Sequence, residues 1–151
     1  MARWARGEAV IERMIATGEL QKVQGPAADG EPWLAKAQRT HASAVVLADT
    51  DRDSAYVLAY DAARLAGTAL LAHQGLRPTT KGGHLVVDEA LRAQFGEVFR
   101  PFRGLRIRRN ELEYPAFPGD GADEAEIEKA LAGADQIVKA ARKLIAEVGI
   151  F

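Results

Sequence analysis

The segment spanning residues 54–73 is apolar on almost every side when it is read as a helix. It reads SAYVLAYDAARLAGTALLAH, and its formally charged side chains are Asp61 and Arg64. A helix that is apolar all round is buried by neighbours on several sides. Small residues such as Ala63 and Gly67 allow those neighbours to approach closely. This segment therefore predicts the centre of a helical bundle.

The other segments supply the neighbours of that helix. Apolar residues recur at steps of four and three from Ile127 to Val148, after acidic first turns that suit a helix N-terminus. Thr50 and Asp53 have the spacing of a capping box before the central helix. No segment alternates as a strand does. Shorter helical patterns cover about residues 4–20, 31–48, 84–95 and 102–112. We expect an all-α antiparallel bundle of about five helices, folded as one domain over residues 1–151.

The composition narrows the classes of function. The chain has no cysteine, and it carries 20 basic against 21 acidic side chains. Thiolate metal sites are therefore excluded, and a surface that coats nucleic acid over its whole area is not expected. The three histidines stand too far apart for a zinc pattern, so we expect no metal and no cofactor. No stretch is apolar enough for a membrane span or a signal peptide, which predicts a cytoplasmic protein.

Arginines are concentrated between residues 100 and 109, where there are five. The planar guanidinium fork matches phosphate bidentately, which makes Arg103, Arg106 and Arg108 candidate contacts for RNA. The alternative is a solvated basic face paired with Glu111 and Glu113.

Arg109 takes an unusual position within this segment. On the helical stripe from Phe102 to Leu112 it lies where an apolar residue is expected. An inward arginine needs a partner, so Arg109 either is locked in an ion pair or lines a site that binds an anion. Asn110 offers an amide that can orient a neighbour, and the hydroxyl of Tyr114 can fold back towards Arg109.

These features together resemble HEPN domains, small helical proteins of bacterial toxin–antitoxin and defence systems. The resemblance rests on the alanine-rich segment from residue 53, the Gly-rich turn before residue 84, and Arg-Arg-Asn-Glu-Leu-Glu-Tyr-Pro. Many HEPN proteins carry Arg, a polar residue that is often Asn, three to five further residues, and then His. Arg109 and Asn110 match the first two positions, and Tyr114 stands where the histidine is expected.

The resemblance implies a metal-independent endoribonuclease toxin that acts as a homodimer. Arg109 and Asn110 would grip the scissile phosphate, and Tyr114 or His41 would assist. An unperturbed tyrosine keeps its proton up to about pH 10, so it is a poor general base. His41 is the candidate substitute because it lies on an inward stripe of its helix; the alternative is a core histidine bonded to a neighbour.

A second function stays open beside the first. It is a catalytically inactive HEPN module that binds RNA, a nucleotide or a protein partner. The resemblance implies an antitoxin of the nucleotidyltransferase type as the partner. Asp61 has two interpretations as well: it orients Arg109, or it pairs with Arg64 three residues on.

Overall fold

The computed structural model describes residues 2–151 and confirms the predicted all-α bundle. A single two-stranded sheet accompanies the helices in this range. None of these helices is both long and apolar enough to cross a membrane. Six α-helices are present among the described residues: α1 (Glu8–Ala16), α2 (Glu31–Leu47), α3 (Arg52–His73), α4 (Gly83–Phe95), α5 (Arg100–Glu113) and α6 (Glu124–Leu144).

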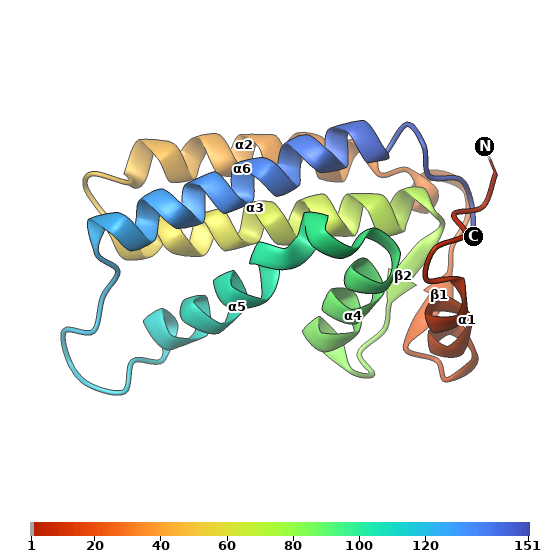
Figure 1. The fold of residues 1–151 in the computed structure, drawn as a ribbon, viewed down its shortest axis with the longest axis horizontal. Helices are drawn as coiled ribbons and strands as arrows, with labels where there is room; N and C mark the ends of the chain where they lie inside the picture. The colour runs from red at the N-terminus through yellow and green to blue at the C-terminus, as the bar shows by residue number, and fades with distance from the viewer. Residues whose placement is uncertain (1) are drawn as a thin grey trace.

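The long helices α2, α3 and α6 lie side by side along the molecule (Figure 1). The shorter helices α4 and α5 lie along one side of this layer, and α1 lies at the end where the two chain termini meet. Helix α3 contacts α2, α4, α5 and α6, so the segment that is apolar all round is the centre of the bundle.

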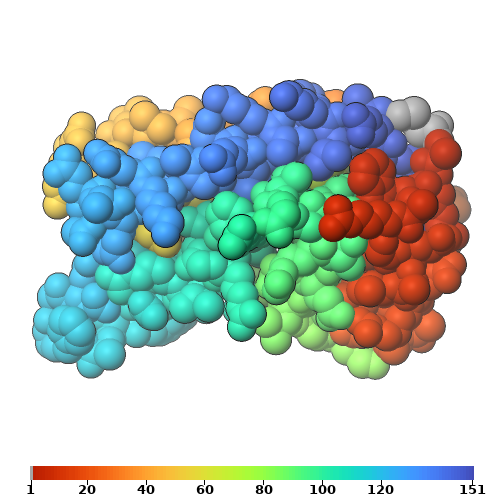
Figure 2. All heavy atoms as spheres, viewed as in Figure 1, coloured from red at the N-terminus to blue at the C-terminus, as the bar shows by residue number. Residues whose placement is uncertain are grey.

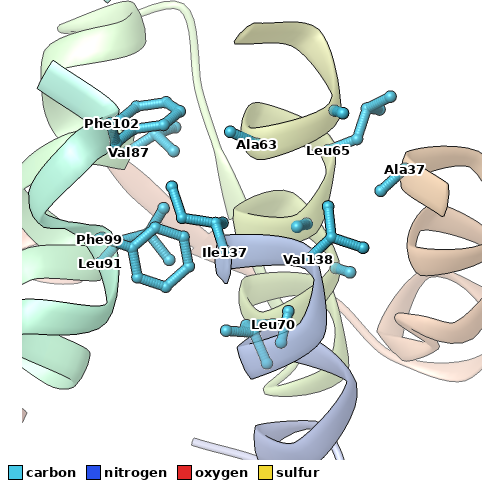
Figure 3. Close-up of a cluster of buried hydrophobic side chains, with 14 of the residues drawn as sticks. Ala37, Ala63, Leu65, Leu70, Val87, Leu91, Phe99, Phe102, Ile137 and Val138 are labelled. Carbon is cyan, nitrogen blue, oxygen red and sulfur yellow. The ribbon is translucent and has the colours of Figure 1, made fainter. Parts of the chain in front are cut away.

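The core forms where α3, α4 and α6 meet. Ile137 of α6 points towards Leu91 of α4 and towards Phe99 (Figure 3), and all three side chains are fully buried. A methyl group added at Gly67 of α3 would overlap with Leu91. The predicted role of small residues on α3 is therefore confirmed at Gly67, because a side chain there would displace Leu91 of α4 from its place in the core.

The start of α3 differs from the prediction. Asp51 is the residue that caps the helix, and its carboxylate accepts hydrogen bonds from the backbone N–H and the hydroxyl of Ser54. The capping box predicted for Thr50 and Asp53 is wrong. Asp53 instead accepts a hydrogen bond of 2.8 Å from the backbone N–H of Ala122, which ties the start of α3 to the loop before α6.

The small sheet was not predicted. Strand β1 (Leu20–Lys22) pairs antiparallel with β2 (Leu76–Pro78), so that Leu20 lies opposite Pro78. The first helix was expected to run to Leu20, but it ends at Ala16, before the positive φ of Gly18. Strands of three residues are too short to show an alternating pattern in the sequence.

Candidate functional site

Helix α5 carries the five arginines of the candidate segment. It begins at Arg100 with Pro101 in its first turn, where proline is well tolerated, and it ends at Glu113. Tyr114 follows, and its position before Pro115 disfavours helical geometry. The arginines separate into two groups, because Arg100, Arg103 and Arg106 line a groove beside α4, whereas Arg108 and Arg109 lie outside it and are paired with acidic residues.

Arg108 lies at the centre of an ion-pair network. Its guanidinium donates to both carboxylate oxygens of Asp120 at 3.2 and 3.3 Å, to Glu126 at 2.9 Å and to Glu111 at 3.0 Å. It also donates to the backbone carbonyl of Gly121 at 3.1 Å. The hydrogen bonds to Asp120 raise the pKa of Arg108 above its ordinary value, and the hydrogen bonds to Glu111 and Glu126 raise it as well. Arg108 therefore fastens the loop before α6 to α5, and its predicted contact with RNA would have to displace these partners.

Arg109 is half-buried between its own helix and α3. Its guanidinium lies 3.3 Å from the carboxylate of Glu113 and donates to the amide oxygen of Asn110 at 3.2 Å. The guanidinium carbon lies 5.6 Å from the centre of the Tyr60 ring, which suits a cation–π contact. The Arg109 Nε is buried without a hydrogen-bond partner. The ion pair with Glu113, one of the two alternatives read from the sequence, is present.

The same environment buries Tyr60 and shifts its pKa. Its ring is almost fully buried and stacks on Phe102 at 5.6 Å between ring centres. Burial raises the pKa of the Tyr60 hydroxyl above its ordinary value, although the charges of Arg64 and Arg109 act in the opposite direction. Tyr60 therefore stays protonated at neutral pH and offers Arg109 the face of a neutral ring.

Tyr114 lies at the exposed end of α5. Its side chain is 79% exposed, and its hydroxyl makes no hydrogen bond within residues 2–151. Its backbone N–H donates to the carbonyl of Asn110 at 2.9 Å. Tyr114 and Asn110 thus share one solvent-facing end of the helix with the half-buried Arg109.

His41 lies between α2 and α6. Its Nε2 is 3.1 Å from the backbone carbonyl oxygen of Leu131, so the ring is bonded to a neighbour as the alternative interpretation expects, although the side chain is half-buried and not part of the core. Of the two partners expected for Asp61, the structure shows Arg64, whose Nε lies 3.6 Å from the Asp61 carboxylate. The structure therefore joins Arg109 to Asn110, leaves the Tyr114 side chain in solvent instead of folded back onto Arg109, and binds the His41 ring to α6.

The groove between α4 and α5 has a volume of about 680 Å³. It opens as a notch between the yellow-green atoms of α4 and the teal atoms of α5 (Figure 2). Arg100, Arg103 and Arg106 line it from α5, and Arg92 lines it from α4. Two of the arginines predicted to contact RNA, Arg103 and Arg106, therefore share one concave surface.

The groove carries an excess of positive charge. Arg100 pairs with Glu97 at 3.3 Å, and Glu89, which also lines the groove, pairs with Arg13 of α1. No acidic side chain of the described residues pairs with the remaining arginines of the groove, which are Arg92, Arg103 and Arg106. The one acid left without a cation there is Asp88. Three arginines thus face one carboxylate, in a chain whose formal net charge is −1.

Sequence reasoning missed Arg92 and Asp88 because the segment of α4 was read for its apolar residues alone. The spacing does hold a signal for Asp88. It lies three residues before Leu91 and seven before Phe95, which places a carboxylate on the buried stripe of the helix. The exposed Arg92 carries no such signal, because its position beside α5 follows from how the two helices pack.

Comparisons of the chain with models of protein families, with curated proteins and with solved structures gave no match. The likeness to HEPN domains therefore stays a prediction that rests on the residues named above. Within residues 2–151, no three histidine, aspartate or glutamate side chains are grouped so that they can hold a metal ion.

Proposed function

We propose that the protein is an RNA-binding module of the HEPN type, which holds the RNA backbone in the groove between α4 and α5. The observation that carries this proposal is the set of three arginines in the groove, Arg92, Arg103 and Arg106, which form no ion pair with any acidic side chain of residues 2–151 and outnumber the one unpaired carboxylate there. Guanidinium groups bind phosphate through two parallel hydrogen bonds, and such contacts position a nucleic acid. The groove's volume of about 680 Å³ is sufficient for a nucleotide.

The charge of the whole chain favours a local site of this kind over a broad basic surface. The net charge is −1, and the pairs formed by Arg108 and Arg109 remove two further arginines from the free positive charge of α5. Binding through three arginines predicts a moderate dependence on salt, with a slope of roughly −2 in log affinity against log salt for single-stranded RNA. The proposal includes a cytoplasmic location for the protein.

Fluorescence anisotropy with a labelled single-stranded RNA tests the proposal. Arg103→Ala and Arg106→Ala should each weaken binding several-fold and lower the salt slope by about 0.7. The matched control is Arg39→Ala, because Arg39 of α2 is exposed and lies outside the groove. Equal affinities of the Arg103 and Arg39 variants, or no binding by the wild type, would rule the proposal out.

A metal-independent endoribonuclease is the second candidate function, and one observation favours it. Arg109 donates a hydrogen bond to Asn110, and both lie at the end of α5 that carries Tyr114. In this proposal two copies of the chain meet at that end, and each contributes its Arg109 and Asn110 to a phosphate of the RNA. An antitoxin of the nucleotidyltransferase type would then cover the same surface.

The second candidate is tested by incubating the purified protein with mixed RNA in EDTA. Cleavage that survives chelation and disappears in Arg109→Ala would support it, and Tyr114→Phe would show whether the hydroxyl takes part. RNA that stays intact at high concentrations of folded, dimeric protein would exclude catalysis. Such a result would leave the binding proposal in place.

A further inference from the structure

The groove between α4 and α5 contains a group that phosphate binding alone does not explain. Asp88 of α4 lines this groove although its side chain is only 6% exposed. Its Oδ1 is closed off from solvent and has no hydrogen-bond partner. No cation of the described residues pairs with the carboxylate, so Oδ2, the oxygen that keeps solvent contact, is where its charge can be satisfied.

The other buried polar side chains of the core have hydrogen-bond partners. Within residues 2–151 three polar side chains are classed as buried, Gln74, Asp88 and Gln94. Gln74 and Gln94 donate to each other through their amides at 2.6 and 3.1 Å, which leaves Asp88 alone without a partner. A buried carboxylate without a partner is destabilising, and destabilising residues of this kind are characteristic of sites that bind a ligand.

A second unpartnered group lines the same groove. The Nε of Arg106 is buried and has no acceptor, and Arg106 does not form an ion pair with Asp88. Because the Nε is closed off from solvent, a ligand in the groove meets the terminal nitrogens of this unpaired guanidinium on α5 and the Oδ2 of Asp88 on α4. A ligand that satisfies the groove has to offer both a donor and an anionic group.

The charges of the groove narrow the chemistry of that ligand. Arg92, Arg103 and Arg106 repel a simple cation and attract a phosphate, but a bare phosphate would leave the carboxylate of Asp88 without a hydrogen-bond donor. A nucleotide combines the two requirements, because its phosphate is anionic and its base is neutral. Cytosine, adenine and guanine carry an exocyclic amino group that donates to a carboxylate. Uracil lacks that group, and its N3–H donor lies between two carbonyl oxygens, at least one of which would be brought close to the carboxylate of Asp88.

We propose that Asp88 reads the base of a nucleotide in this groove by accepting a hydrogen bond from the exocyclic amino group. Arg92, Arg103 and Arg106 hold the phosphate of the same nucleotide or of its neighbour. For an RNA ligand the inference rests on the binding function proposed above. The groove then selects cytosine, adenine or guanine and discriminates against uracil.

Fluorescence anisotropy with labelled eight-nucleotide oligo(C), oligo(A) and oligo(U) at one salt concentration tests this selectivity. The wild type should bind oligo(C) and oligo(A) about tenfold more tightly than oligo(U), which corresponds to one favourable base contact. Asp88→Asn should bring the three affinities close together. Arg103→Ala is the matched control, because the loss of a phosphate contact should weaken all three by the same factor.

The result distinguishes this inference from the proposed function. Equal affinities for the three oligomers, unchanged in Asp88→Asn, would overturn base reading and leave RNA binding in place. If no oligomer binds, the RNA proposal fails, and thermal unfolding with CMP or UMP then decides whether the ligand is a free nucleotide. CMP should raise the melting temperature of the wild type clearly more than UMP does, and the difference between CMP and UMP should disappear in Asp88→Asn. An absence of any effect of CMP would then overturn the inference as well.

The stability of Asp88→Asn provides an independent measurement. If Asp88 is an unpaired buried carboxylate, its neutral isostere should melt at a higher temperature than the wild type in the absence of ligand. A variant that melts lower, or does not fold, would show that the carboxylate is needed by the fold itself and would overturn a ligand-binding role.

Discussion

The carboxylate of Glu113 lies 3.3 Å from the guanidinium of Arg109, one turn earlier on α5. Both side chains are about one third exposed, so the pair is in contact with solvent. An RNA phosphate that approaches this end of α5 therefore competes with Glu113 for the same donors. The ion pair lowers the free positive charge at the very residue that matches the first position of the HEPN motif.

Glu113→Gln should strengthen RNA binding if Arg109 contacts the phosphate. Exposed ion pairs of this kind stabilise by roughly 0.2–1 kcal/mol, so the expected gain in affinity is at most about fivefold. Glu128→Gln is the matched control, because it makes the same change of charge at an exposed position on α6. Anisotropy titrations that give the same gain for both variants would mean that only net charge matters and that Arg109 is not a contact.

The Arg109–Glu113 pair was readable from the sequence because both residues lie on one helix at a spacing of four. The central position of α3 was readable for a similar reason, since a helix that is apolar all round has to be buried whatever surrounds it. The Arg109–Asn110 contact belongs to the same class, because the two residues are neighbours in the chain. In each case the spacing along the chain fixes the relation.

Contacts between distant elements were not readable in this way. Arg108 was predicted to contact RNA, but its partners Asp120 and Glu126 come from the following loop and from α6. The groove could not be predicted for the same reason, because Arg92 and Arg103 approach each other only when α4 and α5 pack together. These relations depend on tertiary packing, which no periodicity in a single sequence encodes.

Arg108→Ala should destabilise the fold by about 1.5–3 kcal/mol, because hydrogen bonds to charged groups at Asp120, Glu126 and Glu111 are lost. The free energy of unfolding in urea measures this loss. Arg103→Ala is the control on the same helix, since Arg103 is exposed and unpaired within residues 2–151 and its loss should change stability by less than about 0.5 kcal/mol. Similar stabilities of the two variants would mean that the network does not hold the loop to α5.

The N-terminal cap of α3 predicts that the stability of the fold depends on pH. Hydrogen bonds from Ser54 hold the pKa of Asp51 below its ordinary value of 3.8. Because the pKa is lower in the folded state, the stabilisation is present above about pH 4 and is lost as the pH falls through the folded value. The stability difference between the wild type and Asp51→Asn should therefore be constant from about pH 7 to 5 and shrink near pH 3. Urea unfolding at these three pH values measures it, and a difference that does not change with pH would contradict the role of the charge.

The buried amide pair of Gln74 and Gln94 should behave as a unit. Gln74→Leu removes one partner and leaves the Gln94 amide buried without hydrogen bonds, which is expected to cost about 1–3 kcal/mol. The double variant Gln74→Leu/Gln94→Leu removes both amides, so its loss should be clearly smaller than the sum of the two single losses. The backbone hydrogen bonds from Phe151 to Gln74 and from the Trp4 indole to Gln94 stay available in all three variants. Urea unfolding of the four proteins closes the cycle, and strictly additive losses would mean that the two amides do not depend on each other.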